Sequence, residues 1–228
     1  HIAALMLLAG TDASPTPAWI VRNHAPIPVH TVALVNHGRM LVAGDAEGRV
    51  SVTTLSTYRP IVFWQAHQGA VLRADAWSGY LVTHGRDHSL RVWKMPDELG
   101  SVALSSSMAK NLPLPTMLHE MGVNALNYCA YDMCIRNEDT PTLDGWLVIP
   151  NTLESGWIDL YHVPSQQRII ESLGRQADIR SGTERPAIVM ALQICILRDI
   201  LWIVAGYEDG VLQAWTIPVS TMEPTLVW

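Results

Sequence analysis

The stretch that decides the fold is His84-Gly85-Arg86-Asp87-His88-Ser89-Leu90-Arg91-Val92-Trp93. An apolar run, residues 80–82, enters this short polar turn, and a second run leaves it with side chains that alternate in character. Side chains alternate between the two faces of a strand, and Gly or Asp relieves strain in a tight turn, so the pattern predicts a β-hairpin. Further copies occur at residues 44–53, 152–161 and 206–215.

Each copy has an additional apolar run upstream, and two of the copies have an outer run downstream. Four strands in a meander are typical of the blade of a β-propeller, so we predict an all-β, WD40-type propeller with about four blades. With Thr53, Trp93, Tyr161 and Trp215 as equivalent positions, the steps between copies are 40, 68 and 54 residues. The first step matches the WD40 period, and the longer steps require insertions.

The repeats divide the chain into an N-terminal segment, residues 1–16, and a partial propeller, residues 17–228. The approximate repeats are 17–64, 65–118, 119–172 and 187–228, with the first strand of the third repeat expected at residues 123–128. Trp19–Arg22 and Thr225–Trp228 look like outer strands whose partner strands are not encoded. We therefore expect part of a larger ring, most plausibly one of seven blades, with a closed four-bladed ring as the alternative.

One repeat carries a set of polar residues that can form a closed network. His67 precedes its first strand, Thr83 lies on the second, Asp87 in the turn and Trp93 on the third. An Asp in the turn can hold the His, which can pass a hydrogen bond through Thr to the indole N–H. Buried polar groups need such partners, since each unpaired one costs about 1–3 kcal/mol.

The other repeats depart from this set, and we expect substitutes at the same places. The first has His24 upstream with Glu47 and Thr53 at the Asp and Trp positions. The third has Ser155 and Tyr161, and the fourth keeps Asp209 and Trp215 without an upstream His.

Composition limits the function classes. The chain is 49% hydrophobic and 16% charged, its net charge is −6, and Lys94 and Lys110 are its only lysines. This argues against disorder and against direct nucleic-acid binding through phosphate neutralisation. The apolar stretch Ile2–Ala9 is too short to span a bilayer and lacks the charged start of a signal peptide, so we expect a soluble intracellular protein without membrane partners.

For each residue that could carry chemistry, a structural role is better supported than a chemical one. Cys129 and Cys134 lack a second pair for zinc, and His84 and His88 on a hairpin need not converge on a metal. Asp45 and Glu47 in a Gly-rich turn more often bind local backbone amides than act as an acid–base pair. We predict no metal, no cofactor and no catalytic set.

Insertions are the better candidates for binding. Pro96–Thr116 is predicted to follow a third strand and Asp132–Gly145 a first strand, so both would project from one face of the blades. Long loops on rigid scaffolds often bind partners, although linkers look the same in sequence. Leu112, Leu114 and Met117 are the candidate apolar anchors of this partner-binding loop.

Six stretches together resemble a known family: Pro17–His24, Gly44–Gly48, Trp64–Leu72, Thr83–Trp93, Val123–Cys129 and Val204–Gly210. The resemblance is to the fungal ASTRA-associated WD-repeat proteins, which are related to animal G-protein β-subunit-like propellers. It extends from about Pro17 to the end of the chain. Asn23 in place of the usual Gly, and Thr53 in place of Trp, depart from the family pattern.

The resemblance implies a non-catalytic, nuclear scaffold subunit of the ASTRA complex, linked to chromatin remodelling and to maturation of phosphatidylinositol-kinase-related kinases. Its implied partners are the pseudokinase, the RuvB-like ATPases and the Tel–Tti cochaperone. Two alternatives remain open: a G-protein-β-like cytoplasmic signalling adaptor, and an enzyme with its site at the ring centre.

Overall fold

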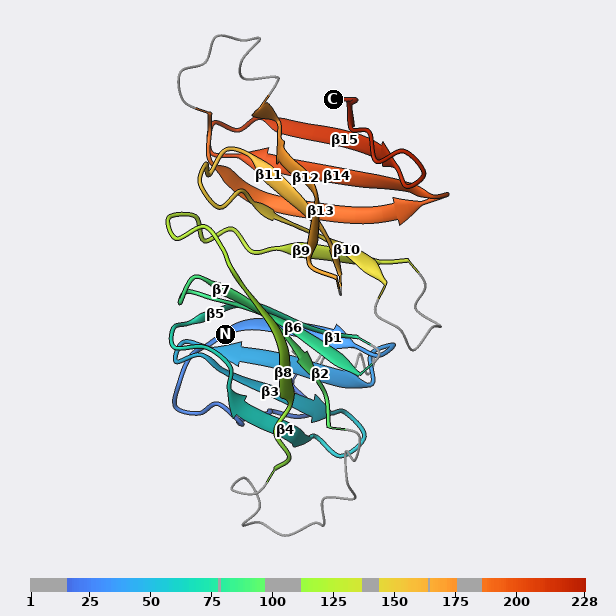
Figure 1. Ribbon diagram of the computed structural model, residues 1–228. Helices are drawn as coiled ribbons and strands as arrows, with labels where there is room; N and C mark the ends of the chain where they lie inside the picture. The colour runs from blue at the N-terminus through green and yellow to red at the C-terminus, as the bar shows by residue number, and fades with distance from the viewer. Residues whose placement is uncertain (1–15, 78, 97–111, 137–143, 164, 176–185) are drawn as a thin grey trace.

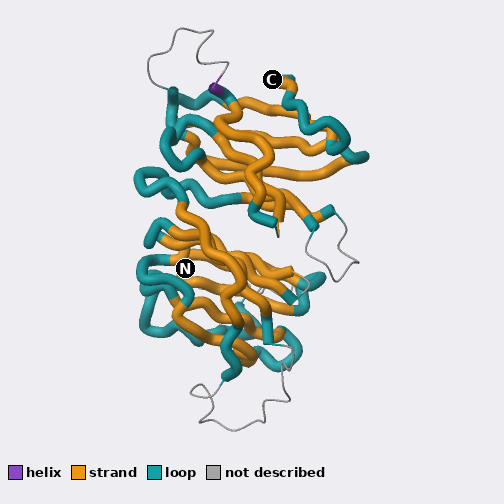
Figure 2. The backbone as a smooth tube through the Cα atoms, viewed as in Figure 1, coloured by secondary structure: helices purple, strands orange, loops and turns teal. Residues whose placement is uncertain are grey.

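The computed structural model of the chain describes residues 16–77, 79–96, 112–136, 144–163, 165–175 and 186–228. Strands, turns and loops make up nearly all of this part (Figure 2). Among the described residues no helix has the length and apolar character needed to cross a membrane.

The strands form four separate antiparallel sheets of four strands each, and every sheet is a meander in chain order. The first contains β1 (Val29–Val35), β2 (Met40–Asp45), β3 (Arg49–Thr54) and β4 (Arg59–Gln65). The second contains β5 (Val71–Trp77), β6 (Tyr80–Gly85), β7 (Ser89–Lys94) and β8 (Thr116–Gly122). The third contains β9 (Asp132–Ile135), β10 (Gly145–Pro150), β11 (Ile158–Val163) and β12 (Gln167–Leu173). The fourth contains β13 (Val189–Leu197), β14 (Ile200–Tyr207), β15 (Leu212–Pro218) and β16 (Thr225–Leu226).

The four sheets follow one another in space as in sequence, from the first sheet at one end to the fourth at the other (Figure 1). This is the predicted blade arrangement, and the prediction of an all-β propeller fold with four blades is confirmed. Inner strands such as β10, which is buried at every position, are covered on both faces by the neighbouring sheets. Burial on both faces explains why these strands read as continuous apolar runs rather than as alternating ones.

Apolar side chains fill each junction between sheets. Between the first and second sheets, Trp64 and Trp93 meet edge to face, with ring centroids 5.6 Å apart, beside the fully buried Val42 and Leu81. The second junction is filled by eight buried residues, Val82, Leu90, Val92, Val123, Tyr131, Leu147, Ile149 and Val163. The third is centred on Ile158, Leu160, Ile203 and Trp215. Apolar burial is the main stabilising contribution to these contacts.

A buried carboxylate ties three sheets together at their first strands. Asp132 of β9 lies 2.8 Å from the Arg73 guanidinium of β5 and accepts hydrogen bonds from Ile194 N (2.7 Å) and Gln193 Nε2 (2.9 Å) of β13. Burial raises the pKa of Asp132, although the Ile194 amide and the Arg73 charge act against it. The sequence analysis did not identify this residue as a contact between blades.

Two predicted features of the third repeat are wrong. Residues 123–128 form no strand, because Asn124 and Asn127 turn their side-chain oxygens onto the backbone amides of nearby residues and hold a compact connection instead. The first strand is β9, so Asp132 belongs to a strand and not to an insertion; residues 137–143 lie outside the described part.

The outer strands also differ from expectation. The second sheet extends to Gly122, beyond the predicted repeat boundary at residue 118. At the N-terminal side only Ile20 of Trp19–Arg22 forms a bridge, whereas Thr225 and Leu226 pair with β15. The number of blades in a complete ring stays a prediction.

Candidate functional site

The four residues predicted to form a network in the second repeat lie in one hydrogen-bonded chain. Trp93 Nε1 donates to Thr83 Oγ1 (2.9 Å), and Thr83 Oγ1 lies 2.8 Å from His67 Nε2. His67 Nδ1 lies 2.8 Å from Asp87 Oδ1, and Asp87 also accepts from Ser89 Oγ (2.8 Å) and Gln68 N (2.9 Å). The turn, the connection before β5 and the third strand are therefore joined.

The chemistry of these groups sets the direction of the chain. An indole N–H only donates, so the Thr83 hydroxyl is free to donate to His67 Nε2, and the His67 proton resides on Nδ1 and points at Asp87. Burial lowers the pKa of His67 and outweighs the opposing charge of Asp87. For Asp87, burial alone would raise the pKa, but the bonds from Gln68, Ser89 and His67 outweigh it and lower the pKa to about 2. A neutral His67 held between the Thr83 hydroxyl and an ionised Asp87 serves to hold the blade together rather than to carry out chemistry.

In the first sheet the residue that holds the His is Asp45, and the prediction of Glu47 for this role is wrong. Asp45 Oδ2 lies 2.8 Å from His24 Nδ1, and its other oxygen accepts the amides of Glu47 and Arg49. The Glu47 side chain is mostly exposed and pairs with Arg49. Asp45 sits two residues earlier, at the end of β2, from where its short side chain reaches both the turn amides and the His24 ring. As expected for a turn residue, Asp45 binds backbone amides.

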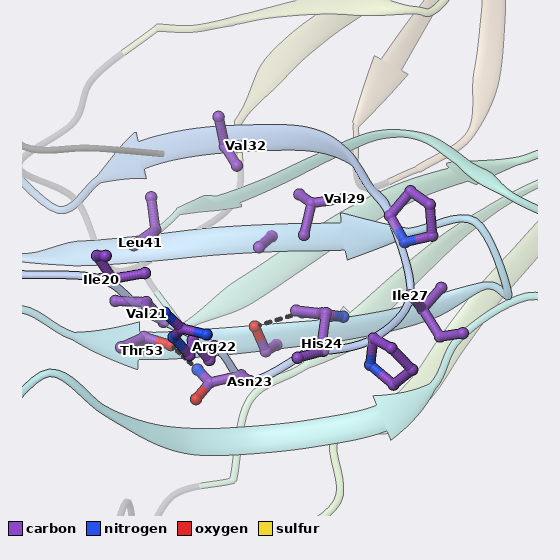
Figure 3. A pocket seen from close by; sticks show the side chains of 15 residues that line it. Ile20, Val21, Arg22, Asn23, His24, Ile27, Val29, Val32, Leu41 and Thr53 are labelled. Carbon is purple, nitrogen blue, oxygen red and sulfur yellow. Dashed lines mark hydrogen bonds between the residues drawn. The ribbon is translucent and has the colours of Figure 1, made fainter. Parts of the chain in front are cut away.

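The first sheet also splits its network. His24 Nε2 lies 2.8 Å from Ser51 Oγ, while Thr53, at the Trp position, accepts a separate bond from Asn23 Nδ2 (2.8 Å). These residues line a cavity of about 220 Å³ between residues 20–29 and strands β1 to β3. Figure 3 shows His24 and Asn23 reaching the strands, and apolar Ile20, Leu41 and Val32 complete this part of the lining.

The third sheet uses different residues for the same purpose. Asp159, fully buried in β11, accepts from Asn151 Nδ2 (2.9 Å) and Ser172 N (2.9 Å) and pairs with Arg168 at 3.3 Å. At the position of Asp87, the Ser155 hydroxyl accepts from Asn124 Nδ2, and the Ser155 carbonyl oxygen accepts from Asn127 Nδ2 and from the amide of Val189.

In the fourth sheet Asp209 and Trp215 are not joined to one another. Asp209 Oδ1 accepts the amide of Val211 (3.0 Å) in an exposed turn, whereas Trp215 is buried among apolar residues of the third and fourth sheets. The structure thus places Asp209 as a local turn residue and Trp215 as a core residue.

The candidate partner-binding residues fall into two groups. Leu112 is half-buried and Leu114 is 68% exposed, and both precede β8. Met117 does not belong to a loop, because it pairs with Trp93 as part of β8, although its side chain is 48% exposed. The remaining residues of that insertion, 97–111, lie outside the described part.

The alternative chemical interpretations find no support in the geometry. His84 is buried, with a pKa lowered to about 4 by burial, while His88 is exposed in the turn. Burial also raises the pKa of Cys129 and of Cys134 to about 12, as expected of inert thiols. Within the described ranges, no group of three or more His, Cys, Asp or Glu residues is arranged to hold a metal ion.

Comparison with known proteins gives the relatives of this set of blades. ASTRA-associated protein 1 of Verticillium alfalfae is 36% identical over 216 residues, covering 88% of this chain and 50% of that protein. ASTRA-associated protein 1 of Penicillium rubens is 37% identical over 218 residues, covering 86% and 48%. By sequence, the chain is a relative of fungal ASTRA-associated protein 1. It spans about half the length of these relatives, and no protein-family model matches it.

Solved structures agree with the propeller fold. The Cps50 (Swd1) β-propeller domain of Myceliophteria thermophila superposes with a TM-score of 0.63 at 12% identity, covering 95% of this chain and 66% of that one. U3-55K superposes with a TM-score of 0.56 at 11% identity, covering 91% and 54%. At such identities the likeness concerns the fold alone. The relation to ASTRA-associated protein 1 rests on sequence.

Proposed function

We propose that the chain is a non-catalytic WD-repeat scaffold of the nuclear ASTRA complex, linked to chromatin remodelling and to maturation of phosphatidylinositol-kinase-related kinases. The observation that carries the proposal is the 36% identity to ASTRA-associated protein 1 over 88% of the chain. The name of those relatives refers to association with ASTRA.

The geometry is consistent with a scaffold. The polar residues that could resemble a catalytic set, His67, Asp87 and Asp45, are engaged in bonds that hold turns and strands in place. Asp132 binds the first strands of neighbouring sheets. Blades held in this way present their turns at fixed positions, which lowers the entropy lost when a partner binds.

The direct test is affinity purification of the tagged chain from fungal cells, followed by mass spectrometry. We expect recovery of the pseudokinase, the RuvB-like ATPases and the Tel–Tti cochaperone, and nuclear fluorescence of a tagged copy. Recovery of a Gγ-type helical partner without RuvB-like ATPases would instead support a G-protein-β-like adaptor and overturn the proposal.

A further inference from the structure

Two leucines protrude from one edge of the second and third sheets. Leu126, in the connection from β8 to β9, is 88% exposed, and Leu153, in the turn from β10 to β11, is 93% exposed. Tyr128 lies close to Leu126 in sequence and is also exposed. An isolated exposed leucine needs no explanation, but exposed apolar side chains grouped on adjoining turns are a feature of interaction sites.

Hydrogen bonds join the two turns directly. Asn124 Oδ1 accepts the amide of Leu126 (2.8 Å), and Asn124 Nδ2 donates to the carbonyl oxygen of Asn151 (2.7 Å). Asn151 Oδ1 in turn accepts the amide of Leu153 (3.0 Å). The backbone under each leucine is therefore held by an Asn side chain, and the two turns lie side by side.

The same connection is anchored to the neighbouring sheets. Val123 N donates to the carbonyl oxygen of His88 in the β6–β7 turn (3.0 Å), and Asn127 Nδ2 donates to that of Val189 in β13 (2.9 Å). In Figure 1 this connection is the yellow-green segment that protrudes at the left between the second and third sheets. Its backbone is already ordered, so binding there would not have to order it.

Two arginines contact aromatic rings that belong to the same two segments as the leucines. The Arg86 guanidinium lies 4.6 Å from the Tyr128 ring centroid, and that of Arg175 lies 5.1 Å from the Trp157 ring centroid. Trp157 belongs to the same turn as Leu153, and its amide donates to Glu154 O. Two cations thus lie at this edge of a chain whose net charge is −6, with Glu154 of the Leu153 turn as an acidic neighbour. A ligand that complements both features carries apolar side chains and negative charge.

We propose that Arg86, Leu126, Tyr128, Leu153 and Arg175, hereafter the Leu126 surface, bind an acidic segment of a partner protein that inserts leucine-like side chains between the arginines. This deepens the proposed function, on which the identity of the partner rests. A protein segment is favoured over nucleic acid because two arginines with exposed leucines cannot neutralise a run of phosphates, which typically takes six or more cationic contacts.

The first experiment measures binding of labelled peptides to the purified chain by fluorescence anisotropy. The probe is a short peptide with two leucines flanked by glutamates; comparison peptides replace glutamate by lysine or leucine by serine. We expect the leucine–glutamate peptide to bind at least about tenfold more tightly than either comparison peptide, a difference of about 1.4 kcal/mol. Equal binding of all three, or no binding, would overturn the proposal. Tighter binding of a labelled oligouridine would also overturn it, in favour of nucleic acid.

Substitutions locate the site. The double variant Leu126→Glu, Leu153→Glu should lose at least about tenfold in affinity for the leucine–glutamate peptide, since buried apolar anchors dominate such contacts. Arg86→Glu should lower the affinity for the leucine–glutamate peptide and raise the affinity for the lysine peptide, because it reverses the local charge. The matched control is Leu197→Glu, which places the same charge at an exposed leucine at the end of β13, the strand end opposite Val189. All variants should unfold at the wild-type temperature.

The same variants separate this proposal from the proposed function. If the tagged wild-type chain recovers the ASTRA subunits and the double leucine variant does not, while Leu197→Glu does, both proposals stand. If the double variant recovers them as well as wild type does, the Leu126 surface is not the docking site and the scaffold function stands. If wild type recovers none of them, the scaffold function fails, and the peptide measurements alone decide the Leu126 surface.

Discussion

The second and fourth sheets share strand order and register but hold their turns in different ways. In the second, Asp87 binds His67, Ser89 and Gln68 and so joins the turn to the strands around it. In the fourth, the described residues give Asp209 one side-chain partner, the nearby amide of Val211. Both sheets nevertheless form, so apolar packing suffices to make a blade, and the polar network adds stability where it is complete.

The largest expected effect is that of His67→Ala in the second sheet. The substitution leaves a cavity and removes the partners of Asp87 and Thr83, so the free energy of unfolding should fall by about 4 kcal/mol. Urea denaturation followed by tryptophan fluorescence measures this. His119→Ala, at an exposed position of the same sheet, should change stability by less than about 0.5 kcal/mol. A loss below about 1 kcal/mol for His67→Ala would mean that the network contributes little.

The pH dependence of stability should come largely from the second sheet. His84 has a folded-state pKa of about 4, below the ordinary value of 6.5, because burial disfavours its charged form. Between these values the unfolded chain binds more protons, so stability is fully present above about pH 6.5 and falls as the pH drops towards 4. The loss should approach 3 kcal/mol, roughly.

The matched variant for this titration is His84→Gln, which should remove the part of the pH dependence that comes from His84 and leave the part from His67, whose pKa burial also lowers. The corresponding position of the fourth sheet is Gly206, which pairs with Ala191 as His84 pairs with Arg73. The fourth sheet therefore carries no titratable side chain at this position. A variant that retained the full slope between pH 6.5 and 4 would assign the effect to other groups.

One alanine substitution probes the space around the network. A Cβ on Gly85 would meet the His67 ring at 2.4 Å, whereas a Cβ on Gly206 would come no closer than 3.3 Å, to the flexible Leu212 side chain. Because His67 is held in place by its bonds, Gly85→Ala should lower the free energy of unfolding by about 2 kcal/mol. Gly206→Ala should change it by less than about 1 kcal/mol. Calorimetry of both variants measures these effects. Equal losses for the two substitutions would contradict this account.

The sequence was informative where local patterns act alone. Alternating runs around polar turns predicted the hairpins, and the spacing of His67, Thr83, Asp87 and Trp93 predicted which residues meet. The role of Asp45 was missed because it lies two residues before the expected position, and only the fold shows that it reaches His24.

Contacts between sheets could not be predicted in the same way. Asp132 binds residues some sixty positions away in either direction, and no local sequence pattern predicts Arg73 or Gln193 as its partners. Asn124 and Asn127 do carry a signal, because Asn favours turns, but the apolar residues around them read as a strand. The exposure of Leu126 and Leu153 depends on those turns, so the sequence patterns placed Leu126 on a strand and Leu153 in a hairpin and assigned neither to a site.

The most direct test of the central claim compares Asp87→Ala with Asp209→Ala, the same substitution at equivalent turns, by urea denaturation at neutral pH. The account predicts a loss of about 2–3 kcal/mol for Asp87→Ala, which leaves His67 without its acceptor, and less than about 0.5 kcal/mol for Asp209→Ala. Equal losses, or a larger loss for Asp209→Ala, would contradict the claim that the second sheet is held by a closed polar network and the fourth by apolar packing.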